Sequence, residues 1–128
     1  DSSTSRGLGD VYKRQMWFYN LKVYNGPAFS MHKNGERKEK GDIVNGAKSG
    51  SWSGWDEKGN LKYKGDYLDN KEDGKWMGYH VNGKTKYEGL YKDGKQIGKW
   101  KYFNKRGKLT TEEEYNSDGI VVKSKNFK

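Results

Sequence analysis

Two histidines, His32 and His80, are the side chains of this sequence best suited to acid–base chemistry at neutral pH. Catalysis needs a nucleophile, an acid–base pair or a metal cluster in a pocket that excludes water. Each histidine stands two residues before an Asn-Gly dipeptide, which is typical of a turn, and Asn104 follows His80 by 24 residues. We therefore expect both histidines to be exposed turn residues, and we predict no catalytic residues and no enzyme activity.

The acidic residues and the absence of cysteine bear on metal binding. A chain without cysteine has no disulfide, no thiolate zinc site and no cysteine nucleophile. A zinc site needs ligands at close spacing or in a converging fold, and the sequence indicates neither. The acidic residues Asp56-Glu57, Asp69 and Glu72-Asp73 lack the regular spacing of a calcium loop, and turn formation accounts for the aspartates. We expect no metal site and no cofactor.

The 128 residues include 26 Lys or Arg and 17 Asp or Glu, which gives a net charge of +9. A basic protein is a candidate for nucleic-acid binding. The positive charge is spread over the chain without a continuous basic stripe, and 21 of the 23 basic residues after residue 15 are lysines. Arginine is the residue that forks onto phosphates and guanine edges. We do not expect nucleic acid to be a partner.

Lysines alternate with apolar residues in two segments, where they define a candidate basic face: Lys62, Lys64, Lys84 and Lys86. Each lysine near an anionic membrane adds about 1 kcal/mol to binding. Lysines on a strand also keep a sheet soluble and discourage pairing at its edges. Anionic lipid therefore remains an alternative partner.

The sequence repeats with a period of 24 residues. Trp52, Trp76 and Trp100 recur at this interval, as do tyrosines and several series of glycines. Only 30% of the residues are hydrophobic, so the five Trp and ten Tyr side chains must supply most of a thin core. The repeat domain spans residues 16–128 as a half repeat, four repeats and a tail: 16–26, 27–50, 51–74, 75–98, 99–122 and 123–128.

Each repeat has the pattern of a β-hairpin. Asn34-Gly35 and Asn82-Gly83 favour a two-residue type I′ turn, which needs positive φ at both residues. In 61–67, apolar residues and a glycine alternate with charged ones, as in a strand with one buried face. A second turn follows, for example at Asp93-Gly94. The sequence predicts an all-β fold, an elongated single-layer antiparallel meander.

Pairs of aromatic residues three apart form a candidate interaction face: Trp52 and Trp55, Trp76 and Tyr79, and Trp100 and Phe103. In a regular strand the two members of a pair point to opposite faces. A bulge or a close backbone approach at Gly54 and Gly78 would alter this. Two alternatives follow: exposed rows of rings that bind a protein or a cell-surface glycan, or one row buried between the hairpins.

A recurrent pattern of Gly-Lys-Trp, an aromatic residue, Asn-Gly-Lys and Tyr-x-Asp-Gly-Lys is strongest in 75–98. It resembles the variant MORN repeats of the bacterial YwqK-like antitoxin family. The resemblance implies hairpin repeats without an enzymatic centre, and a protein partner that is a toxin. Eukaryotic MORN proteins are similar in repeat length and are associated with scaffolding and membrane contact. The first repeat departs from the pattern, since Ala28 and Ile43 replace Trp and Tyr.

Residues 5–15 (SRGLGDVYKRQ) look like a translated DNA-sequencing adapter, so residues 1–15 are expected to be a disordered leader outside the fold. An adapter at this point would make Met16 an internal methionine and place any native signal peptide upstream. The sequence therefore leaves the localisation open, cytoplasmic or exported. For 16–128 we expect a non-catalytic scaffold for protein–protein interaction, with lipid or glycan binding as the alternative.

Overall fold

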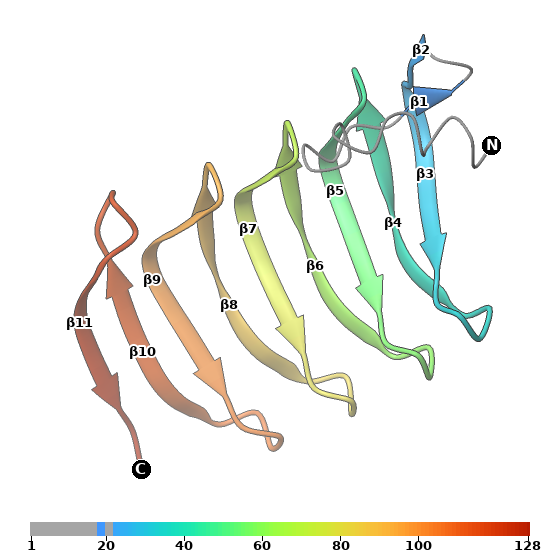
Figure 1. Ribbon diagram of the computed structural model, residues 1–128. Helices are drawn as coiled ribbons and strands as arrows, with labels where there is room; N and C mark the ends of the chain where they lie inside the picture. The colour runs from blue at the N-terminus through green and yellow to red at the C-terminus, as the bar shows by residue number, and fades with distance from the viewer. Residues whose placement is uncertain (1–17, 20–21) are drawn as a thin grey trace.

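The computed structural model describes residues 18–19 and 22–128, and it is all-β. Figure 1 shows an antiparallel meander of hairpins in which each strand from β3 to β11 pairs with the next along the chain. The sheet has nine strands in the order β11-β10-β9-β8-β7-β6-β5-β4-β3, and it is open rather than closed into a barrel. The fold class predicted from the sequence is confirmed.

The strands of the main sheet are eight-residue or nine-residue segments in the middle and shorter at the ends. They are β3 (Gly26–Met31), β4 (Arg37–Val44), β5 (Ala47–Trp55), β6 (Leu61–Leu68), β7 (Lys71–Tyr79), β8 (Thr85–Lys92), β9 (Lys95–Phe103), β10 (Leu109–Tyr115) and β11 (Val121–Asn126). Two short strands, β1 (Phe18–Tyr19) and β2 (Lys22–Val23), form a separate pair. The predicted leader lies outside the described residues, as does part of the half repeat 16–26.

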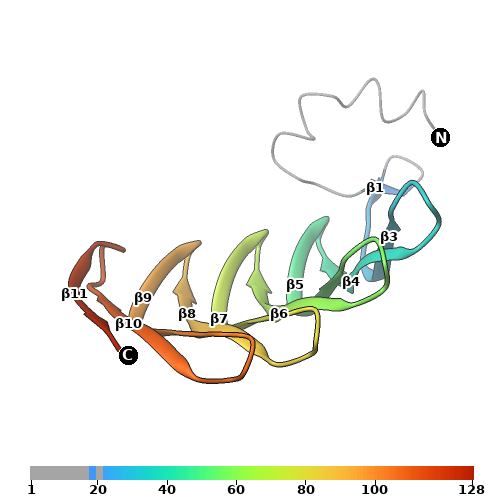
Figure 2. The same ribbon diagram turned by 90° about the horizontal axis from the view of Figure 1, so that it is seen from below.

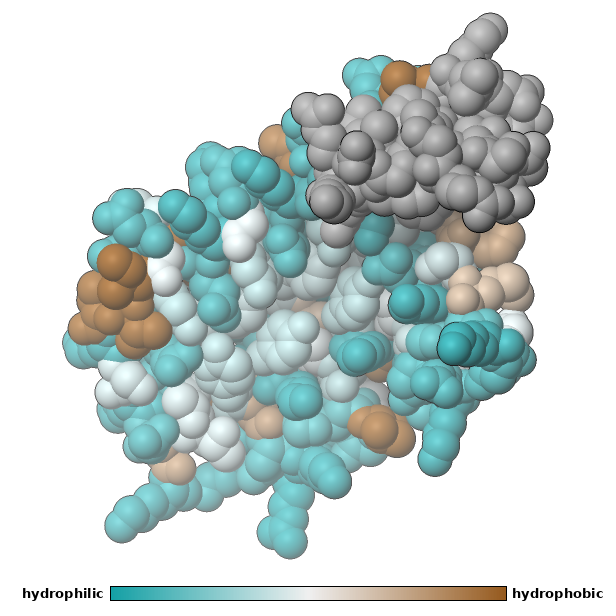
Figure 3. All heavy atoms as spheres, in the orientation of Figure 1, coloured by the Kyte–Doolittle hydropathy of each residue, from teal (hydrophilic) through white to brown (hydrophobic). Residues whose placement is uncertain are grey.

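The sheet is a single curved layer. Figure 2 shows the hairpins as a row of arcs, and the nine strands of the main sheet form one layer. Within 18–19 and 22–128, no helix is long and apolar enough to cross a membrane. Figure 3 shows a mainly hydrophilic surface with several apolar patches, one of them at the place of β11 in Figure 1.

Both kinds of turn lie where the sequence predicts them, but the type I′ geometry occurs in the second kind and not in the first. Positive φ at both central residues, as a type I′ turn requires, occurs at Asn45-Gly46, Asp69-Asn70 and Asp93-Gly94. At Asn34-Gly35 and Asn82-Gly83 only the glycine has positive φ, so the predicted turn type was wrong there. The asparagine instead caps a five-residue connection, in which the Asn34 side-chain oxygen accepts the backbone N–H of Glu36 at 2.9 Å.

The core is a row of tryptophans on one face of the sheet, which we call the tryptophan face. Trp76 is 6% exposed and lies over Gly65 of the neighbouring strand, where a Cβ atom would overlap its ring. Its indole N–H donates a hydrogen bond to the Asp66 carbonyl at 2.9 Å. The same arrangement joins Trp52 to Gly41 and Asp42, and Trp100 to Gly89 and Leu90.

Tyrosines fill the spaces between the tryptophans. The Tyr67 ring packs edge-on between Trp52 and Trp76, with centroids 6.1 and 5.3 Å apart. Tyr91 does the same between Trp76 and Trp100, at 5.7 and 5.0 Å. Such edge-to-face contacts add about 0.5–1.5 kcal/mol beyond the burial of area. A continuous ladder of rings therefore holds the middle of this thin sheet together.

The first repeat ends the ladder with a different set of residues. Ile43, which replaces a tyrosine, is 1% exposed. The Lys48 ammonium lies 4.7 Å from the ring centroid of Trp52 and forms a salt bridge with Glu39 at 3.1 Å. Glu39 also accepts a hydrogen bond from the Tyr63 hydroxyl at 2.7 Å. A buried cation thus covers Trp52, the tryptophan at the N-terminal end of the row.

Candidate interaction face

The two members of each aromatic pair lie on opposite faces of the sheet. Trp76 pairs in register with Gly65, whereas its neighbour Met77 pairs with Lys64. The Tyr79 hydroxyl donates to the Met77 sulfur at 3.8 Å, so Tyr79 lies with Met77, opposite Trp76. We call this second surface the ring face, after its row Trp55, Tyr79 and Phe103.

Register shifts do occur where the sequence suggested a bulge. Between Gly54 and Trp55 the partner residues on β6 change from Tyr63 to Leu61, so the extra residue is Lys62 on the partner strand. The equivalent shift after Gly78 leaves Lys86 as the extra residue on β8. Because β5 and β7 keep their own alternation, the shifts do not bring the paired aromatics together. The glycines serve as close approaches, since a Cβ on either would overlap a tyrosine ring.

The six candidate aromatics therefore separate into a core row and a surface row. Trp52, Trp76 and Trp100 are 1%, 6% and 1% exposed, which leaves no ring for a partner to touch. Trp55, Tyr79 and Phe103 are half-buried. Of the two alternatives open from the sequence, the structure has one row buried, and the surface row alone remains accessible.

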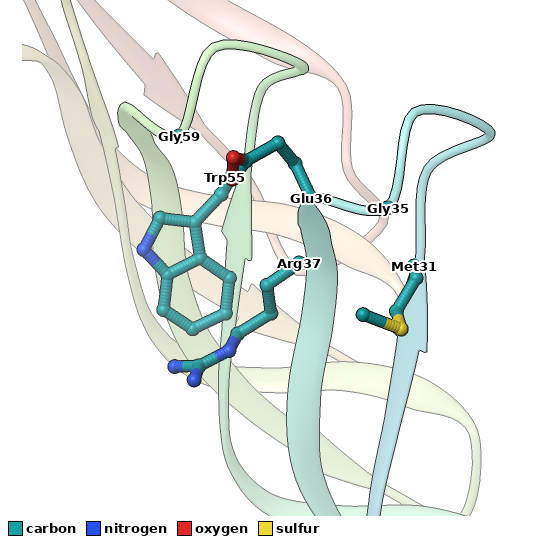
Figure 4. Close-up of a pocket in the computed structure, with 6 residues that line it drawn as sticks. All are labelled: Met31, Gly35, Glu36, Arg37, Trp55 and Gly59. Atoms are coloured by element: carbon teal, nitrogen blue, oxygen red, sulfur yellow. The ribbon is translucent and has the colours of Figure 1, made fainter.

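An arginine that the sequence pattern did not single out contacts the first ring of the surface row. The Arg37 guanidinium lies 5.2 Å from the centroid of the Trp55 ring, in a cation–π contact. Met31 pairs with Arg37 across the hairpin, and Figure 4 shows all three side chains beside one hollow of about 380 Å³. In later repeats the position of Arg37 is Leu61 or Thr85. Because Arg37 does not recur, the repeat pattern of the sequence does not indicate it.

The second ring, Tyr79, lies between two groups of lysines. Lys64 and Lys75 line a hollow of about 190 Å³ on one side of Tyr79. A hollow of about 310 Å³ on its other side is lined by three lysines from neighbouring elements: Lys62, Lys86 and Lys105. In the described part of the chain, none of these five lysines forms a salt bridge. One aspartate also lines each hollow, Asp66 in the smaller and Asp56 in the larger, so the hollows combine an aromatic wall with an excess of positive charge.

The four lysines of the predicted basic face do not all lie in one place. Lys62, Lys64 and Lys86 are exposed and border the hollows at Tyr79. Lys84 is exposed too, but its ammonium donates to the Arg106 carbonyl at 3.2 Å and lies at the hairpin end. Three of the four lysines therefore share one site.

The histidines connect neighbouring hairpins. The His80 Nε2 atom lies 2.9 Å from the Phe103 carbonyl oxygen, and the Asn82 side chain donates to the Lys105 carbonyl at 2.8 Å. His32 makes the matching contact with the Trp55 carbonyl at 2.9 Å. Both histidines are half-buried rather than exposed, because these contacts hold them between turns. They fix the backbone of the surface row at Trp55 and Phe103.

Acidic residues at the turns serve local structure. The Asp56 carboxylate accepts the backbone N–H groups of Lys58 and Asn60, both at 2.9 Å. The backbone hydrogen bond from Asn60 is the main cause of a lowered pKa at Asp56. The described residues contain no group of three or more His, Cys, Asp or Glu placed to hold a metal ion. The expected absence of a cofactor stays a prediction.

The tryptophan face carries the strongest electrostatic shifts. Burial raises the pKa of Tyr67 to about 12, with the charge of Glu72 acting in the same direction. The pKa of Glu39 is lowered overall. Burial raises it, but the hydrogen bond from Tyr63 and the charge of Lys48 together outweigh the effect of burial. Burial and the hydrogen bond to Glu39 raise the pKa of Tyr63. These groups stay in one protonation state at neutral pH.

No model of a known protein family matches this chain, and no curated protein matches its sequence. The fold and the ring face are therefore the basis for a functional proposal.

Proposed function

We propose that the chain is a non-catalytic repeat scaffold that binds a protein partner through its ring face. The carrying observation is the separation of the two aromatic rows. Trp52, Trp76 and Trp100 are buried in the core, while Trp55, Tyr79 and Phe103 stay accessible, with Arg37 beside Trp55 and lysines beside Tyr79. Aromatic residues are enriched in protein interfaces, where they fill pockets of the partner.

The spacing of the rings favours an extended contact. Equivalent rings lie two strands apart, which corresponds to about 10 Å. The lysines around Tyr79 complement acidic groups, and such complementarity raises the rate and specificity of association. The preferred partner is thus a protein with an acidic surface. The resemblance to YwqK-like antitoxins supports a toxin in this role, neutralised by being covered.

Anionic lipid or glycan is the second candidate. Five lysines that form no salt bridge with the described residues outnumber the two aspartates in the hollows beside Tyr79, and each lysine adds about 1 kcal/mol to binding near an anionic membrane. An accessible ring also offers a flat surface for a sugar. Ionic strength separates the candidates, because screening weakens exposed charge contacts far more than a packed aromatic interface.

The test is affinity capture with the full chain at low and moderate ionic strength, followed by protein and lipid identification. The test variant is Lys62→Glu with Lys86→Glu. The control is Lys33→Glu with Lys58→Glu, which makes the same charge change at exposed turns.

The proposal expects a stoichiometric protein that survives moderate salt and is lost only in the test variant. Recovery of anionic lipid alone, released by salt, would establish the second candidate instead. A protein retained equally by both variants would show that the ring face is not the interface.

A further inference from the structure

Among the residues that the structure describes, the strand β11 pairs with β10 on one side and with no strand on the other. The Phe127 N–H donates to the Thr110 carbonyl at 2.8 Å, so it points toward β10. Backbone groups alternate in direction along an antiparallel strand, so those of Ser124 and Asn126 point away from β10. All residues of β11 are exposed. The strand is an open edge that can accept one more strand.

Charges alternate in sign across the last three strands. On the ring face, Lys101 of β9 pairs in register with Glu112 of β10, which pairs with Lys125 of β11. Two residues further along β10, Glu114 pairs in register with Lys99 of β9 and with Lys123 of β11. The Lys99 ammonium also reaches the Glu112 carboxylate at 3.7 Å. The alternation of positive, negative and positive rows stops at the edge on a positive row.

An apolar cluster lies at the start of the same strand. Ile120, Val121 and Val122 are 59%, 42% and 58% exposed. Figure 3 shows a patch of hydrophobic residues at the place of β11 in Figure 1, on a surface that is mainly hydrophilic. A strand added here would bury apolar area as well as backbone groups, which is how strand addition gains affinity.

We propose that β11 accepts an extended segment of a protein partner that carries two acidic residues separated by one residue. Such a segment continues the alternation of charge, because its acidic side chains fall opposite Lys123 and Lys125. Its backbone pairs with Ser124 and Asn126. The site is separate from the hollows at Tyr79 and stands independently of the function proposed for them.

A second copy of the chain fits this edge poorly. Pairing of β11 with β11 brings lysines of both copies together, which is unfavourable. Pairing with β3, the strand at the other end of the sheet, offers no acidic residue, and Pro27 in β3 has no N–H to donate. The charge pattern therefore selects a different, acidic strand.

The test uses a fluorescent peptide, Thr-Val-Glu-Val-Glu-Val-Thr, with both termini blocked, titrated with the full chain by anisotropy. Two peptides serve as controls: one with Lys in place of both Glu, and one with N-methyl groups at alternate residues. The protein variants are Ser124→Pro, which removes an outward N–H, and Ser124→Ala as its control. A third variant, Lys123→Glu with Lys125→Glu, reverses the edge charge.

The proposal expects the acidic peptide to bind, with the lysine peptide, the N-methyl peptide, Ser124→Pro and the charge reversal each weakening binding by roughly tenfold or more. Ser124→Ala should bind like the unchanged chain. Absence of binding by the acidic peptide would overturn the proposal. Equal binding of the N-methyl peptide would also overturn it, since the contact would then not involve strand addition, and that result does not depend on the folding of any variant.

Discussion

The two aromatic rows have the same period of 24 residues and lie three residues apart in sequence, yet they have different physical roles. Each residue of the buried row meets the same partners: a glycine beneath the ring and a carbonyl for the indole N–H. The surface row meets different residues, with Trp55 beside Arg37 and Tyr79 beside Leu61. We infer that a row whose neighbouring residues are the same in every repeat stabilises the fold. A row whose neighbouring residues differ between repeats can serve binding instead.

The largest difference between the rows should appear on removal of a ring. Trp76→Ala is expected to destabilise the fold by about 3–5 kcal/mol, because it leaves a cavity and unpairs the Asp66 carbonyl. Tyr79→Ala should cost no more than about 1 kcal/mol, as for a surface substitution. Urea unfolding of both variants measures the difference. Equal losses would contradict the assignment of the two rows.

The glycine beneath each tryptophan gives the second comparison. Gly65→Ala should destabilise the protein by about 1–3 kcal/mol, because the added methyl group overlaps the Trp76 ring. Ser53→Ala on the ring side of β5 serves as the control and should stay within about 0.5 kcal/mol. Calorimetry of both variants tests this. A neutral Gly65→Ala would show that the ring does not lie on this glycine.

Alkaline pH should destabilise the tryptophan face. Tyr67 has its pKa raised from 10 to about 12 by burial, so unfolding lets it ionise more readily. Its contribution to stability is present below pH 10 and is lost as the pH rises through about 12.

Urea midpoints over this range should fall less steeply for Tyr67→Phe than for the unchanged chain. Ser53→Ala, which changes no titratable group, serves as the ring-face control and should follow the unchanged chain. The same slope in all three proteins would contradict the shifted pKa at Tyr67.

The smallest effect is expected at the hairpin ends. Asn82→Ala removes the hydrogen bond to the Lys105 carbonyl and should cost about 0.5–1.5 kcal/mol. Lys105→Ala retains that carbonyl and serves as the control. Hydrogen exchange should quicken at the turn after β9 in the first variant only, and equal exchange in both would show that the bridge does not hold this turn.

The sequence predicts the architecture well because its main interactions repeat. The period of the tryptophans and the alternation in 61–67 both follow from the buried face of a strand, so they define the hairpins and the meander. The burial of one aromatic row remained an alternative, because spacing of three residues is compatible with either face. The close contact between the Trp76 ring and Gly65 shows which row is buried, and this contact depends on the pairing with the neighbouring strand.

The candidate site was harder to predict, because its residues do not repeat. Arg37 contacts Trp55 from an earlier hairpin, and no regular pattern joins the two. The bulged residues Lys62 and Lys86 lie on the strand opposite the suspected glycines, and only the register of pairing reveals them. Lys62, Lys64 and Lys86 were candidates from the sequence, while Lys75 and Lys105 came to the site through the fold.

The most direct test of the account is hydrogen exchange at the indole N–H groups, followed by NMR and assigned with single Trp→Phe variants. Trp52, Trp76 and Trp100 each donate to a backbone carbonyl and are buried, whereas the Trp55 indole N–H has no partner among the residues that the structure describes. The account predicts slow exchange at the first three and fast exchange at Trp55. Slow exchange at Trp55, or fast exchange at Trp76, would contradict the separation of a core row from a surface row.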